Sequence, residues 1–123
     1  MRFMIFVKAT QHSEAGTLPT RELMEAMGKF NQELIAAGIM QDGAGLKPTS
    51  QGARVSFSGK ERTVRTGPFS HTTELVSGYW IWECKSLDEA ISWVKRAPKP
   101  MPGNSDIEIR PYYEAEDFAA LTE

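Results

Sequence analysis

The sequence has a single cysteine, Cys84, among its 123 residues, so no disulfide can form within the chain. No C-x-x-C motif and no Cys/His spacing typical of a structural zinc site is present. A lone thiol in an apolar stretch is usually a packing residue, because a nucleophilic cysteine also needs a lowered pKa and a nearby base. We therefore predict no metal site and a protein suited to the reducing cytoplasm.

Basic stripes and long hydrophobic runs are also missing. The formal net charge is -2 and the basic residues are scattered, whereas a nucleic-acid-binding protein usually carries a basic stripe. No apolar run approaches the ~20 residues that span a bilayer, and the chain start lacks the cleavage site of a signal peptide. Phosphate loops, dinucleotide fingerprints and nucleophile elbows are absent. We predict no nucleic-acid or membrane partner and no cofactor.

Length and hydrophobic periodicity predict one domain, residues 1–123. The order of its elements is the βαββαβ pattern of the α+β ferredoxin-like fold, with a hairpin insert, an antiparallel sheet and both helices on one face. The predicted elements are a strand at 2–9, a helix at 20–38, a short strand at 39–40 followed by a loop, a hairpin at 53–65, a strand at 77–85, a helix at 86–98, a strand at 106–114 and an acidic C-terminal segment at 114–123.

Local signals fix the ends of the two predicted helices. Thr20 is a good N-cap for the first helix, and Gly38 is suited to the left-handed residue that follows its end. Ser86 and Glu89 have the S-x-x-E spacing of a capping box, which predicts the start of the second helix.

The predicted sheet has more apolar surface than two helices can cover. Its first strand and the strand before the second helix are apolar on both faces. An exposed apolar face of that size usually marks an interface, and the simplest cover is the same face of a second copy. We predict a homodimer with sheets packed face to face, in which Trp80 and Trp82 serve dimer packing rather than ligand stacking. The alternative is that Phe118 and Leu121 fold the C-terminal segment over the sheet.

Three stretches make the chain resemble the YCII-related family, specifically the branch named after a DGPF signature. They are Gly-Pro-Phe at 67–69, Gly-Tyr-Trp at 78–80 and Ser-Leu-Asp-Glu-Ala at 86–90, within a resemblance that covers residues 1–118. The resemblance implies a ferredoxin-like dimeric α/β barrel. It also implies a mostly unassigned function, with a His–Asp pair proposed as the catalytic centre of some members, and a frequent genetic neighbourhood of alternative sigma factors.

The chain departs from this branch around the Gly-Pro-Phe motif. Where the branch has Asp-Gly-Pro-Phe-Ala-Glu-Thr-Lys-Glu, this sequence has Thr66, Ser70, His71 and Thr73. Roles of the two missing acidic side chains and of the missing lysine are therefore not carried over.

The stretch TGPFSHTTE, residues 66–74, has a structural and a functional interpretation. In the structural one, its glycine and proline supply a turn and Phe69 anchors the turn in the core. In the functional one, a helical turn places His71 and Glu74, three positions apart, on one face. The carboxylate would then orient the imidazole for proton transfer.

A second candidate pair is His12 with Asp42. His12 lies in a predicted loop next to Glu14, where it is either solvated or part of a binding loop. Asp42 either caps a turn through its side chain or, by its position after the first helix, matches the acidic partner that the resemblance implies. We predict His12, Asp42 and His71 as candidate catalytic residues.

Arginines on the predicted strands are candidate ligand-binding residues. Two or more of Arg54, Arg65 and Arg110 on one side of the sheet would hold a small anionic ligand through forked hydrogen bonds, with Glu74 nearby. The alternative is that they serve solubility.

Two functions fit these residues. The first is a small-molecule-binding homodimer of acid/base enzyme ancestry, with its pocket between the loops and the helix side of the barrel. The second is a non-catalytic dimeric regulatory or scaffold module linked to transcription control, which the acidic segment favours as a docking site. The sequence does not decide between an enzyme and a binding protein.

Overall fold

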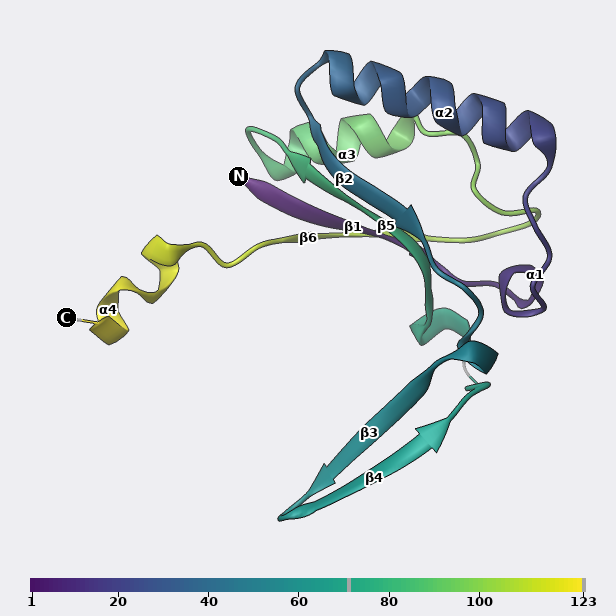
Figure 1. Ribbon diagram of the computed structural model, residues 1–123. Coiled ribbons are helices and arrows are strands. Elements are labelled where there is room, and N and C mark those ends of the chain that lie inside the picture. Colours follow the sequence, from purple (N-terminus) through teal and green to yellow (C-terminus); the bar gives the residue numbers. More distant parts are fainter. Residues whose placement is uncertain (71, 123) are drawn as a thin grey trace.

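The computed structural model describes residues 1–70 and 72–122, and it confirms the ferredoxin-like α+β fold (Figure 1). A four-stranded sheet has the order β2-β5-β1-β6, with neighbouring strands antiparallel and the two long helices on one face. The elements are β1 (Arg2–Lys8), α1 (Gln11–Glu14), α2 (Arg21–Ala36), β2 (Met40–Gly45), η1 (Thr49–Gln51), β3 (Ala53–Ser58), β4 (Glu61–Thr66), η2 (Thr72–Glu74), β5 (Val76–Glu83), α3 (Leu87–Lys95), β6 (Ile107–Pro111), η3 (Ala115–Phe118) and α4 (Ala119–Thr122).

Both long helices begin where the sequence predicts and α2 also ends there, whereas α3 ends at Lys95, three residues before the predicted end. The Thr20 hydroxyl accepts a hydrogen bond from the Leu23 N–H at 3.1 Å, and Gly38 follows α2 with a φ of 73°. Ser86 Oγ accepts from the Glu89 N–H at 3.1 Å, but the Glu89 carboxylate takes the N–H of Lys85 instead of completing the box. None of the helices in the described residues is both long and apolar enough to cross a bilayer.

The loop predicted after residue 40 is wrong, because β2 continues through two glycines to Gly45. Gly43 pairs with Trp80 of β5, and a Cβ added at Gly43 would lie 2.8 Å from Trp80 Cδ1. A glycine, normally weak in strands, is needed here because the indole ring lies against the backbone. The predicted loop after β1 also contains the short helix α1, which is capped by Thr10 and Ser13.

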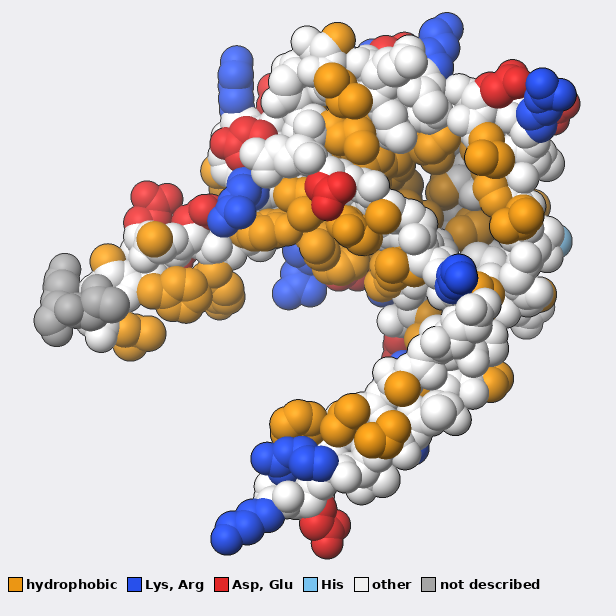
Figure 2. Space-filling view, viewed as in Figure 1, with side chains coloured by type: hydrophobic (Ala, Val, Ile, Leu, Met, Phe, Trp, Pro, Cys, Tyr) orange, Lys and Arg blue, Asp and Glu red, His pale blue; other side chains and the backbone are white. Residues whose placement is uncertain are grey.

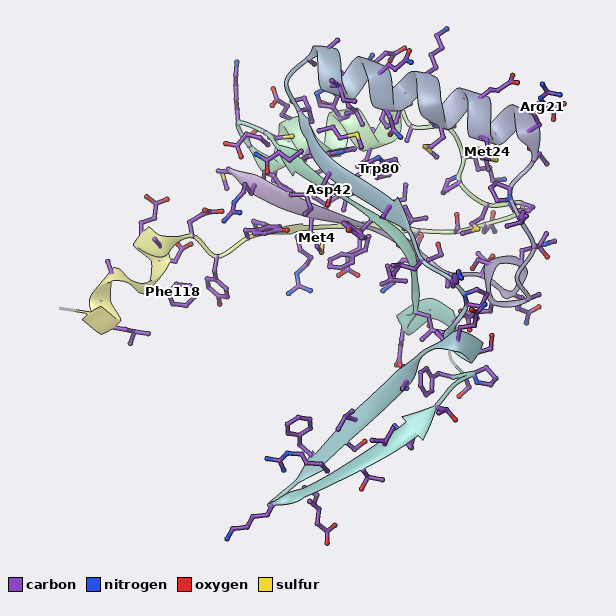
Figure 3. The ribbon with its side chains drawn as sticks, in the orientation of Figure 1. Met4, Arg21, Met24, Asp42, Trp80 and Phe118 are labelled. Atoms are coloured by element: carbon purple, nitrogen blue, oxygen red, sulfur yellow. The ribbon has the colours of Figure 1, made fainter. Side chains whose placement is uncertain are left out.

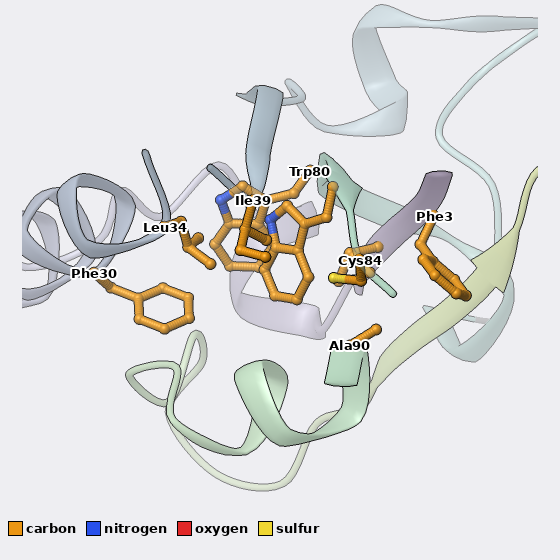
Figure 4. Close-up of a cluster of buried hydrophobic side chains, with 9 residues drawn as sticks. Phe3, Phe30, Leu34, Ile39, Trp80, Cys84 and Ala90 are labelled. Atoms are coloured by element: carbon orange, nitrogen blue, oxygen red, sulfur yellow. The ribbon is translucent and has the colours of Figure 1, made fainter. Parts of the chain in front are cut away.

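The core lies between the helices and the sheet (Figure 4). Trp80 and Trp82 are 5% and 0% exposed there, and the Phe30 ring of α2 meets both edge-on at 6.0 and 6.4 Å. The predicted use of the two tryptophans in dimer packing is therefore wrong. The physical reason is the alternation of side chains along a strand. Trp82 pairs with Phe3 and Trp80 pairs with Ile5, so both tryptophans lie on the face of the sheet that the helices cover.

The other face of the sheet, which we call the open face, carries Met4 and Phe6 of β1 and Tyr79 and Ile81 of β5. Met4 pairs with Ile81, and Phe6 pairs with Tyr79. All four are partly buried, and Met4 points away from the helices (Figure 3). The described C-terminal segment points away from the sheet and does not cover this face (Figure 1).

Two arms project from the domain. One is the β3–β4 hairpin, which forms a two-stranded sheet of its own, and the other is the C-terminal tail, residues 112–122. Together with the open face they give the chain 8794 Å² of accessible surface, whereas a compact monomer of this mass exposes about 6,600 Å². The excess of about one third comes from the two projecting arms and the uncovered sheet face.

An ion pair fixes the base of the C-terminal tail. Arg2 donates two hydrogen bonds to the Glu114 carboxylate, at 2.9 and 3.0 Å. These hydrogen bonds lower the pKa of the Glu114 carboxyl and raise the pKa of Arg2. The Arg2 guanidinium also lies 4.7 Å from the centre of the Tyr112 ring, so the tail leaves the sheet in a defined direction.

Candidate functional site

A hydrogen-bond network joins α1 to the base of the hairpin. The Glu14 carboxylate accepts from the Thr49 N–H at 3.1 Å and from the Thr49 hydroxyl. The same hydroxyl oxygen accepts from the Phe69 N–H at 3.0 Å. Three segments that are distant in sequence therefore meet at the hydroxyl of Thr49.

The Gly-Pro-Phe motif completes this network. A Cβ on Gly67 would overlap the carbonyl oxygen of Thr49 and lie 2.5 Å from its carbonyl carbon, so only glycine fits. Phe69 is partly buried, and the Arg54 guanidinium lies 4.0 Å from its ring centre. Phe69 is therefore an anchor for the hairpin base and not, as predicted, for the main core.

A recess lies between α2 and the β2 edge of the sheet, with hydrophobic side chains on its walls (Figure 2). Met24 and Trp80 lie on its two sides (Figure 3), and Met24 is 63% exposed. The Trp80 Nε1–H donates to Asn31 Oδ1 at 2.9 Å. Among the described residues, the Asn31 side chain forms no other hydrogen bond. Its NH₂ group is therefore available to a ligand. We call Met24, Asn31, Gly43 and Trp80 the α2–β2 recess.

The chain does not bring His12 and Asp42 together. Asp42 pairs with Ile81, which pairs with Met4 of β1. His12 comes after β1 ends at Lys8, four residues beyond Met4, which is roughly 13 Å along the strand. His12 is exposed on α1, and Asp42 Oδ1 accepts from the Gly43 N–H at 2.8 Å within β2. The predicted turn-capping role of Asp42 is therefore wrong, because the strand continues through it.

Of the predicted arginines, only two lie side by side. Arg54 and Arg65 are direct cross-strand partners in the hairpin. Arg110 is on β6 and forms an ion pair with Glu108 at 3.4 Å. Glu74 is an exposed residue of η2. His71, its predicted partner, lies outside the described residues.

The sequence analysis did not identify Glu14 and Asn31, whose side chains form the long-range hydrogen bonds of these two regions. Glu14 was considered only as a neighbour of His12, and Asn31 only as a position on a helix. Glu14 and Thr49 are 35 residues apart, and Asn31 and Trp80 are 49 apart. No local spacing points to either contact. In the parts of the chain described by the structure, no group of three or more His, Cys, Asp or Glu could hold a metal ion.

Comparisons with known proteins agree on the family and the fold. The sequence model of the YCII-related domain matches residues 1–115. An uncharacterized protein of Rhizobium meliloti (strain 1021) is 30% identical over 89 residues, which is 72% of each chain. A solved structure of 5-chloro-2-hydroxyhydroquinone dehydrochlorinase (TftG) from Burkholderia phenoliruptrix AC1100, in complex with 2,5-dihydroxybenzoquinone, is similar with a TM-score of 0.53. It shares 18% identity, covering 94% of this chain and 97% of that chain, and this likeness shows the fold alone.

Proposed function

Because the chain belongs to the YCII-related family, we propose that it is a homodimer that binds a small molecule in the α2–β2 recess. The observation that carries the binding proposal is the apolar recess beside Met24 (Figure 2) together with the Asn31 amide, whose oxygen accepts from the Trp80 Nε1–H. The Trp80 ring itself is buried and belongs to the core. Ligand sites are typically apolar hollows with a few polar groups that orient the ligand. The open face supports the homodimer, since an uncovered apolar sheet face is an interface by default.

The chemistry of the recess favours a flat ring that carries a carbonyl or hydroxyl group. The exposed Met24 offers a thioether that packs well on aromatic rings, and the Asn31 amide donates to an oxygen. The bound 2,5-dihydroxybenzoquinone of the TftG structure is a ligand of this class and is therefore the first probe. For the predicted anionic ligand, Arg54 and Arg65 are the remaining candidate pair, because they lie next to each other.

We expect 2,5-dihydroxybenzoquinone to quench the tryptophan fluorescence of the protein, and Met24→Glu to weaken this binding by about tenfold, or ~1.4 kcal/mol. The new carboxylate would have to lose water beside the ligand. The matched control is Ile35→Glu, since Ile35 is 60% exposed on the same helix and lies 11 residues further, about 16 Å along the axis. Equal affinities in the two variants would remove the recess as the binding site.

The acid/base roles of His12, Asp42 and His71 are a separate part of the proposal. An imidazole changes charge near neutral pH, and losing a general acid or base typically costs about 10²-fold or more in rate. If the protein turns over a hydroxylated quinone or hydroquinone, we expect His12→Ala or His71→Ala to reduce turnover by that factor with binding unchanged. Full turnover in both variants would remove the two histidines as acid/base groups, and no turnover in the wild type would leave a binding protein without catalysis.

The second candidate function is a regulatory or scaffold module. The observation that favours it is the exposure of the tail, in which Tyr113 and Leu121 are 77% and 82% exposed. Such a segment suits docking by another protein. This function predicts that deletion of residues 114–123 abolishes a partner interaction while ligand binding in the recess is kept.

A further inference from the structure

The β3–β4 hairpin has an apolar face on which, in the described chain, only the Arg62 guanidinium of the same hairpin packs, 4.4 Å from the centre of the Phe57 ring. Cross-strand pairing places Val55 opposite Val64 and Phe57 opposite Arg62, while alternate positions such as Ser56 face the other way. Val55, Val64 and Phe57 are 50%, 64% and 72% exposed. An isolated two-stranded hairpin is at best marginally stable in water. The apolar face therefore requires a surface to pack against.

The C-terminal tail offers such a surface at the other end of the sheet. Tyr113 and Phe118 stack with ring centroids 5.1 Å apart, and with Leu121 they form an exposed apolar cluster. The hairpin leaves the sheet after Gly45 and the tail leaves it after Pro111, at opposite strand ends (Figure 1). Apolar side chains line the side of the hairpin that faces the sheet and the lower side of the tail (Figure 2).

The charges of the two arms are complementary. The hairpin, residues 53–66, carries four basic residues and one acidic residue, whereas residues 112–122 carry three acidic residues and no lysine or arginine. Glu114 is neutralised by Arg2, which leaves Glu116 and Asp117. A groove of about 640 Å³ at the base of the tail is lined by residues that include Arg2, Glu83 and Glu116. Glu83 is paired with the N-terminal amine, so Glu116 supplies the remaining negative charge beside the apolar cluster.

A two-fold axis parallel to the open face brings two copies together face to face, and its two limiting directions differ in which strand ends meet. With the axis along the strands, each hairpin would meet the other hairpin and each tail the other tail, so like charges would face each other. With the axis across the strands, the ends exchange and each hairpin meets the tail of the other copy. Building on the proposed homodimer, we propose this second arrangement: the hairpin of each copy docks on the tail of its partner, with Phe57 against the Tyr113–Phe118–Leu121 cluster and Arg62 beside Glu116 and Asp117.

Disulfide trapping between differently tagged, co-expressed copies tests this pairing. Phe57→Cys in one copy and Leu121→Cys in the other should give a mixed disulfide on mild oxidation. Its yield should exceed that of either variant alone by about tenfold, since paired thiols in one assembly reach an effective concentration in the mM range. The matched control is Ser56→Cys with Leu121→Cys, because Ser56 lies on the opposite hairpin face. The native thiol gives little background, since burial raises the pKa of Cys84 to about 11.

Three other outcomes would overturn the hairpin–tail pairing, and they show separately whether the homodimer itself exists. Light scattering on the wild type gives either the 13.7 kDa of one chain, which removes homodimer and pairing together, or twice that mass. In a dimer, a disulfide between two Phe57→Cys copies that matches the mixed one shows hairpin against hairpin. A dimer with no trapped species in correctly folded variants likewise overturns the pairing and leaves the homodimer intact.

Discussion

Replacing Ile81 with arginine is expected to turn the homodimer into monomers. Ile81 lies on β5, a central strand, and is partly buried on the open face between Met4 and Asp42. In a face-to-face dimer the new guanidinium would be buried against the apolar open face of the partner. Hot-spot losses of this kind amount to about 3 kcal/mol, on the order of 10²-fold in the dissociation constant.

The variant is chosen so that the subunit itself stays folded. Asp42 is the cross-strand neighbour of position 81, so an arginine there gains a carboxylate partner within its own chain. Ile35→Arg is the control, because it makes the same exchange on the exposed surface of α2. Sedimentation velocity at low micromolar concentration, with circular dichroism for folding, measures the effect. Dimerisation unchanged in Ile81→Arg would mean that the copies associate through another surface.

Local patterns were sufficient for the element order, and the reason is visible at the helix ends. The Thr20 cap and the turn to Gly38 depend on residues within four positions of each other. The hairpin turn at Gly59, with its φ of 57°, is equally local. Helix caps and tight turns are determined by residues close together in the sequence, so they can be predicted without knowing how the strands pair.

Pairing between distant strands decided what the sequence could not show. Both faces of β5 are apolar, so the sequence alone does not say whether Trp80 or Tyr79 faces the helices. The pairing of Trp80 with Ile5, and the helices above them, settle it. The same nonlocal register explains why β2 extends through Gly43, where Trp80 needs the space of a missing side chain, and why Asp42 is far from His12.

Candidate sites were predictable only where the chain neighbours are also spatial neighbours. Arg54 and Arg65 were placed together by the hairpin, whose two-residue turn fixes which positions face each other. The contact of Glu14 with Thr49 depends instead on how the segment after β1 meets the segment after β2. Each of those segments is polar and irregular by itself, and neither contains a sequence pattern that predicts contact with the other.

The second large effect is expected from Gly67→Ala. The added methyl group would overlap the Thr49 carbonyl, and because the obstacle is backbone, η1 must move. That movement would break the hydrogen bonds by which Thr49 joins Glu14 to Phe69. Overpacking of this kind destabilises the folded state by about 3 kcal/mol. Here the strain falls on the base of the hairpin.

The hairpin should therefore open while the core remains folded, since the core residues are all in the sheet, α2 and α3 or beside them. Trypsin cleavage at Lys60, Arg62 and Arg65 follows the population of the open form, so it should accelerate on the order of 10²-fold. Gly28→Ala is the control: nothing lies within 4 Å of its added Cβ, and alanine in a helix should stabilise the chain by about 0.5–1 kcal/mol. If hairpin cleavage in Gly67→Ala stays at the wild-type rate, the Gly-Pro-Phe motif does not hold the arm in place. A joint loss of core stability would instead show that the hairpin base and the core unfold as one unit.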